Sequence, residues 1–157
     1  LYRKVNMIME KKDILKSLRI NHLFSLFAAI LVIVMFETGM LAKGALASVV
    51  PSGGIYVIEV VAVMLTVLLV PLAIKGFTNT LTKNLGRSEE EFLKLFAKKG
   101  FQRIALLFIA LLVNEFVYYG LDYTGSFYCG LLALGSLIYS YPTKMVLEEY
   151  LEKNRTK

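Results

Sequence analysis

Tryptophan is absent from this chain, and cysteine and histidine occur once each, as Cys129 and His22. Structural zinc sites, haem ligation by paired residues and Cys–His catalysis need more of these side chains than the chain has. A single cysteine also excludes a disulfide within the chain. No glycine-rich phosphate loop and no catalytic motif is present. From these absences we predict a protein without a metal, a cofactor or an enzymatic activity.

Charged side chains make up only 19% of the 157 residues, against 57% for hydrophobic ones, and the mean hydropathy is +0.62. A soluble domain of this length has too much surface to be so apolar, so the composition predicts a membrane protein. The net charge of +6 does not indicate nucleic acid, because the basic residues stand in blocks between long apolar runs. Such blocks are typical of cytoplasmic flanks that face anionic lipid.

Four apolar runs are candidates for membrane spans, each of which needs about 20 helical residues. The predicted spans are about 22–42, 55–77, 101–121 and 125–141. Together they predict a single domain, 22–142, with an all-α fold: a four-helix transmembrane bundle with short amphipathic interfacial helices.

Basic segments flank this domain on both sides. Segment 1–21 is predicted to be either a helix on the inner membrane surface or a solvated basic tail, and Met7 or Met9 is a candidate initiator. Segment 143–157 is predicted to be a cytoplasmic amphipathic tail, in which Lys144 and Glu148 are spaced for an ion pair.

The first span also resembles a signal peptide, because an apolar run follows a basic segment and small residues come next. The candidate cleavage site is the stretch Ala45-Leu46-Ala47. Glu37 and Lys43 interrupt the approach to that site, so we favour a retained span.

A short helix is predicted between the second and third spans, over 89–99. Ser88 and Glu91 form the capping box that opens it, and Gly100 is a suitable residue to end it. Its apolar residues lie on one side, which predicts a helix on the inner surface.

Lysine and arginine are distributed unevenly among the flanks of the spans. Six precede the first span, one lies in the next loop, seven lie between the second and third spans, none lies in the following loop, and four come last. The positive-inside rule therefore predicts that both termini and the long middle segment are cytoplasmic, in a multi-pass protein of the bacterial inner membrane.

This orientation brings carboxylates on three helices to a similar depth. Glu37, Glu59 and Glu115 lie roughly 6 to 11 Å below the outer boundary, at about 1.5 Å per helical residue. The predicted ligand- or proton-binding cluster comprises these three together with Asn114, Tyr118, Tyr119 and Asp122.

Two explanations of this cluster stay open. Converging carboxylates could share protons or bind a hard cation, with help from the amide and the tyrosine hydroxyls. Alternatively, a glutamate at such shallow depth reaches headgroups or water, and Asn114 merely hydrogen-bonds to a neighbouring helix.

Small residues recur along the fourth span at helical spacing. They are Gly125, Cys129, Ala133, Ser136 and Ser140. Such a stripe is suited to close helix packing in lipid, and it explains Cys129 as a packing residue.

Three stretches carry a resemblance to a known group of proteins: VPLAIKGF, RIALLFIALLVNEFVYY and TGSFYCGLLALGSLIYSYP. Over about the last two-thirds of the chain, they are similar to uncharacterised small four-span membrane proteins of Bacteroidota-type bacteria. Asn114 and the Tyr118-Tyr119 pair match that group, and Glu59 and Glu115 match it less closely. The resemblance implies a topology and no known activity.

The sequence thus leaves two main functional hypotheses. The first is a non-enzymatic membrane protein that binds a partner or itself through its helices, with the lipid bilayer, a second copy or another membrane protein as partners. The second is a small transporter coupled to protons or a cation through Glu37, Glu59 and Glu115. A lipid-modifying membrane enzyme ranks third, because no nucleophile or metal motif supports it.

Overall fold

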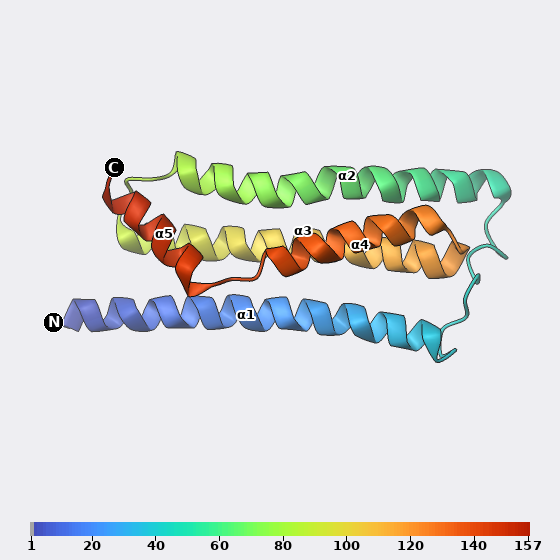
Figure 1. The fold of residues 1–157 in the computed structure, drawn as a ribbon, viewed down its shortest axis with the longest axis horizontal. Helices are drawn as coiled ribbons and strands as arrows, with labels where there is room; N and C mark the ends of the chain where they lie inside the picture. The colour runs from blue at the N-terminus through green and yellow to red at the C-terminus, as the bar shows by residue number, and fades with distance from the viewer. Residues whose placement is uncertain (1) are drawn as a thin grey trace.

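The computed structural model describes the backbone of residues 2–157 and the side chains of residues 9–157. Within that part, the chain is all-helical. The helices are α1 (Tyr2–Glu37), α2 (Ser52–Lys83), α3 (Glu89–Leu121), α4 (Thr124–Tyr139) and α5 (Lys144–Arg155). Figure 1 shows α1 to α4 running along the long axis, with both termini at one end of the molecule and α5 at that same end.

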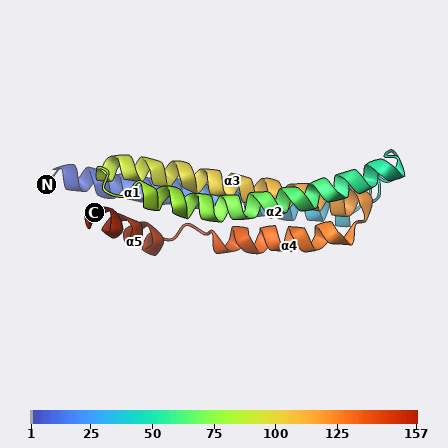
Figure 2. The ribbon, with the colours of Figure 1, turned by 90° about the horizontal axis from the view of Figure 1, so that it is seen from above.

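The central helix is α3, which contacts each of the other four helices. In Figure 1, α1 and α2 lie on opposite sides of it, and Figure 2 shows α4 and α5 on a further side. The side chains of Ile104, Leu107 and Ala110 are completely buried, which places the middle of α3 in the core. The predicted all-helical fold is therefore confirmed.

Within the part of the chain that the structure describes, three helices are long and apolar enough to cross a membrane: Met9–Glu37, Ser52–Lys83 and Glu89–Leu121. Large apolar side chains on their outer surfaces have no protein cover, since Phe27 is 64% and Leu68 65% exposed. An exposed apolar surface of this extent is typical of contact with lipid. The apolar helix α4 has only 16 residues, or about 24 Å of length.

The first predicted span differs from the structure at both ends. Segment 1–21 does not form a separate interfacial helix or tail, because its described part continues into the span as α1. The helix ends at Glu37 rather than near residue 42. Gly39 takes a φ of +78°, a left-handed conformation that glycine adopts without strain, and this turns the chain out of the helix.

The predicted interfacial helix at 89–99 is the first part of α3, not a separate element. Ser88 caps it as expected, since its Oγ accepts a hydrogen bond from the Glu91 amide at 3.4 Å. Gly100 does not end the helix. A β-carbon at Gly100 would lie 3.0 Å from Leu18 of α1, so this glycine permits close contact between two helices.

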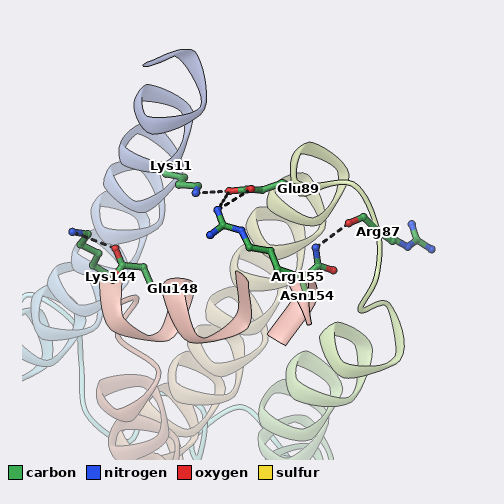
Figure 3. A network of polar contacts seen from close by, with 7 residues as sticks. All are labelled: Lys11, Arg87, Glu89, Lys144, Glu148, Asn154 and Arg155. Atoms are coloured by element: carbon green, nitrogen blue, oxygen red, sulfur yellow. Dashed lines mark hydrogen bonds and ion pairs between the residues drawn. The ribbon is translucent and has the colours of Figure 1, made fainter. Parts of the chain in front are cut away.

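The tail helix α5 is docked on the bundle through both apolar and polar contacts. Leu147 and Leu151 are buried in the main core. Asn154 accepts a hydrogen bond from the Gly86 amide at 2.8 Å and donates one to the Arg87 carbonyl at 2.9 Å. Figure 3 shows the bond to Arg87 among the ion pairs that surround it. The predicted pair between Lys144 and Glu148 is also confirmed, at 3.3 Å.

Candidate functional site

A small cavity lies between α1, α3 and α4, near the turn that joins α3 to α4. Its volume is about 90 Å³. Its lining comprises Ile33 of α1, five residues of α3 including Asn114, Glu115, Tyr118 and Tyr119, and five of α4 including Ser126 and Gly130. Phe127 and Leu131 also line it and are 42% and 50% exposed, so it opens sideways on the apolar surface. We call it the lateral cavity.

Three polar side chains meet at the lateral cavity and are almost entirely buried. Asn114 and Ser126 are 0% exposed, and Glu115 is 7% exposed. The Asn114 amide donates to Thr66 Oγ1 at 2.6 Å and to the Ala110 carbonyl at 2.7 Å. The bond to Thr66 ties α3 to α2, so the interhelical hydrogen bond that was one of the two explanations of Asn114 is observed.

Three buried atoms of this group have no hydrogen-bond partner among the described residues. They are Asn114 Oδ1, Glu115 Oε2 and Ser126 Oγ. A buried polar atom without a partner typically costs about 1–3 kcal/mol. Such groups in a folded protein are usually satisfied by water, an ion or a bound polar group. The lateral cavity therefore has the chemistry of a binding site for a small polar group.

The local geometry of two helices explains how these side chains meet. Neighbouring residues on a helix point about 100° apart, so Asn114 reaches α2 while Glu115 faces the gap between α1 and α4. On α4, Gly130 has no side chain, and a β-carbon there would lie 3.6 Å from that of Asn114. The two backbones therefore approach closely beside the cavity.

Glu37 does not line the lateral cavity, so it does not converge with Glu115 as one of the two explanations required. Its carboxylate is exposed and accepts a hydrogen bond from the Tyr119 hydroxyl at 2.9 Å and another from Lys43 at 2.8 Å. The Tyr119 ring stacks on Phe36, with 4.7 Å between centroids. Glu37 thus joins the end of α1 to α3.

Glu59 and Asp122 also lie outside the lateral cavity. Glu59 is half-buried on α2. Asp122 is exposed and is the C-cap residue of α3, with a φ of +53°. Among residues 9–157, no group of three or more His, Cys, Asp or Glu is placed to hold a metal ion. The predicted three-carboxylate cluster is thus not formed, because equal depth along three helices does not fix the direction in which each side chain points.

The small-residue stripe on α4 is partly buried. Ala133 and Ser140 are fully buried, whereas the other three positions are half-buried. In the first half of α4, the buried face passes through Ser126 and Gly130, one residue after Gly125 and Cys129. Ser126 was missed by the sequence analysis because serine is common at the start of any helix.

A second polar cluster, which the sequence did not predict, lies where α4 ends before Pro142. Arg103 donates to the Ser140 carbonyl at 2.9 Å, and Arg19 donates to the Pro142 carbonyl at 3.1 Å. His22 is 1% exposed and packs edge-on against Tyr141, with 5.2 Å between the ring centroids. The available signal was Pro142, because a proline ends a helix, and the carbonyl groups at a helix end have no helical partners.

Comparisons of the chain with protein-family models, with curated proteins and with solved structures gave no match. The resemblance to small four-span proteins of Bacteroidota-type bacteria therefore stays a prediction. The site must be interpreted from its own geometry and chemistry.

Proposed function

We propose that this chain spans the bacterial inner membrane four times, with α4 as the fourth span. At about 24 Å, α4 alone is shorter than the roughly 30 Å hydrocarbon core, so the segment 140–142 would complete the crossing. Non-helical backbone at membrane depth is tolerated where protein satisfies its carbonyls. The hydrogen bonds from Arg19 and Arg103 to this segment support the proposal.

We also propose that both termini are cytoplasmic. The two termini, α5 and the α2–α3 connection lie at one end of the molecule (Figure 1). All but one of the 18 lysines and arginines lie at that end or in the half of a helix nearest to it, the exception being Lys43. Because positively charged flanks remain in the cytoplasm, this asymmetry supports the orientation.

The function that the site supports best is non-enzymatic binding of a membrane partner through the lateral cavity. The observation that carries this proposal is the set of three buried polar atoms without partners. Ligand pockets for drug-sized molecules measure about 300–1,000 Å³. A cavity of about 90 Å³ holds only a side-chain polar group or about three waters, at ~30 Å³ each. A polar side chain from a neighbouring helix fits this space, and the sideways opening gives it access.

The proposal is tested by site-specific photo-cross-linking in intact membranes. A photoreactive amino acid at Leu131 would stand at the rim of the cavity. Leu132 is the matched control, because it is 55% exposed against 50% for Leu131 and does not line the cavity. We expect an adduct from position 131 only, which Glu115→Ala weakens. Doubled mass would identify a second copy, another mass would identify a different protein, and equal adducts at both positions would contradict the proposal.

A second candidate function, coupling to protons or a small monovalent cation, is favoured by the burial of a single carboxyl group in the cavity. A carboxylate in a low-dielectric span is a functional candidate by default. The test is proton flux in liposomes that contain the purified chain and a pH-sensitive dye. Flux that Glu115→Gln abolishes and Glu59→Gln preserves would support coupling. The absence of proton flux in the wild type would refute coupling to protons.

A further inference from the structure

A second and larger cavity lies at the opposite end of the bundle, where both termini are. It has a volume of about 620 Å³ and runs between α1 and α5. Lys12, Lys16 and Arg19 line it from α1, and Lys144 lines it from α5. Figure 3 shows α5 beside α1 at this end. We call this cavity the basic groove, and none of its residues lines the lateral cavity.

Two lysines of the basic groove are already paired with carboxylates. Lys11 forms an ion pair with Glu89, and Lys144 lies 3.3 Å from Glu148 (Figure 3). Lys11 is thus paired with a residue of α3, and Lys144 with a residue of its own helix, so these two lysines contribute little net charge to the groove.

The other cations of the basic groove remain available to a ligand. Lys12 and Lys16 form no salt bridge among the described residues, and both are exposed. Arg19 uses its Nε for the Pro142 carbonyl at 3.1 Å, which leaves its terminal nitrogens. The groove therefore presents three unneutralised cationic groups on a single helix.

The same face of α1 changes from cationic to apolar along the basic groove. Lys12, Lys16, Arg19 and Leu23 stand at i, i+4, i+7 and i+11 and so share one face. Ile20 and Leu23 line the groove and are 57% and 55% exposed. A positive end followed by an apolar end matches a phospholipid, in which a phosphate is joined to hydrocarbon chains.

We propose that the basic groove binds one anionic phospholipid of the cytoplasmic leaflet. Lys12, Lys16 and Arg19 would surround the phosphate, and Leu23 would contact an acyl chain. Lysine and arginine are the usual partners of phosphate oxygens, and the volume lies within the range of specific ligand sites. The inference rests on the proposed orientation and does not involve the partner-binding cavity. A free phosphate would leave the apolar half of the groove unused.

The experiment uses the purified full-length chain in neutral detergent, with bound lipid counted by native mass spectrometry. Phosphatidylglycerol, phosphatidylcholine and inorganic phosphate are the three probes. We expect one retained phosphatidylglycerol per chain, weaker retention of phosphatidylcholine, and no displacement by inorganic phosphate. Equal retention of the two lipids, or displacement by inorganic phosphate at a similar concentration, would overturn the proposal.

The double variant Lys12→Gln with Lys16→Gln should weaken phosphatidylglycerol binding about 30-fold. Each basic side chain near an anionic lipid contributes about 1 kcal/mol, and 1.4 kcal/mol corresponds to a factor of ten. Lys83→Gln with Lys98→Gln is the matched control, because it removes the same charge at exposed positions outside the groove. An equal loss of phosphatidylglycerol binding in both double variants would show that the groove is not a specific site. Glu115→Gln should leave lipid binding unchanged, because Glu115 does not line the basic groove. A negative result here would therefore not count against partner binding at the lateral cavity.

Discussion

Asn114 and Glu115 are adjacent, buried and polar, yet they have opposite relations to their surroundings. The Asn114 side chain donates two short hydrogen bonds, one of them to another helix, and only its Oδ1 has no partner among the described residues. Glu115 has no side-chain hydrogen bond to any described residue that would hold it in place, and its Oε2 is buried without a partner. The burial of Asn114 is explained by its hydrogen bond to α2, which stabilises the fold, whereas no contact explains the burial of Glu115. The sequence could identify both as candidates from their position in an apolar run, but it could not tell which one packs against α2.

The bond between Asn114 and Thr66 should have a measurable coupling energy. In a double-mutant cycle of Asn114→Ala and Thr66→Val, we expect a coupling of about 0.6 kcal/mol and no more than about 1.7 kcal/mol, the range for interhelical bonds in membranes. Unfolding in mixed detergent measures it. The control is Asn79→Ala, at an exposed position on α2, which should show no coupling to Thr66→Val. Zero coupling for Asn114 would mean that the bond has no energetic role.

At the scale of the helices, α3 could be predicted in part. Its cap at Ser88 and its end near Leu121 follow from capping chemistry and the length of the apolar run. Its continuity through Gly100 could not be predicted, because a glycine after a basic stretch normally indicates a helix end. The helix continues because Gly100 packs against Leu18 of α1, a residue that is distant in sequence.

Substitution of Gly100 should separate α1 from α3. We expect Gly100→Leu to lower the free energy of unfolding by about 1–3 kcal/mol, because the added side chain would overlap with the fully buried Leu18. Gly135→Leu on α4 is the matched control, since a β-carbon there has no other atom within 4 Å. Its effect should stay within about 0.5 kcal/mol, as for other surface positions. Equal losses would show that the contact is not specific.

The docking of α5 should depend on Asn154, which is 5% exposed and bonds to two backbone groups of the α2–α3 connection. Asn154→Ala leaves both groups without partners, so we expect faster hydrogen exchange over 84–88 and a loss of about 1–3 kcal/mol. The exposed neighbour Glu152→Ala serves as the control. Unchanged exchange in Asn154→Ala would show that apolar contacts alone hold α5.

At the scale of the whole molecule, composition and charge asymmetry predict the helical class and a common end for both termini. They do not predict how the helices rotate about their axes. For that reason, three carboxylates at one depth do not meet in one cavity, and Ser126 rather than Glu37 or Glu59 accompanies Glu115.

The proposed topology predicts the side from which each end of the bundle can be labelled. The labelling uses two single-cysteine variants in a Cys129→Ala background. Ser48→Cys lies in the exposed α1–α2 connection, and Thr82→Cys is exposed near the C-terminal end of α2. A membrane-impermeant maleimide should label position 48 in intact spheroplasts and position 82 only after permeabilisation. The background chain without cysteine controls for non-specific labelling. The reverse pattern would contradict the orientation.

The most direct test of the lateral cavity is the free energy of unfolding of Glu115→Met in detergent. If Glu115 is retained for binding, an apolar residue of similar length should stabilise the isolated chain by about 1–3 kcal/mol, since it removes an unsatisfied buried group. Asn114→Ala, one position earlier and also buried, should instead destabilise it. A loss of stability in Glu115→Met comparable to that in Asn114→Ala would show that Glu115 serves the fold and would contradict a binding role for the cavity.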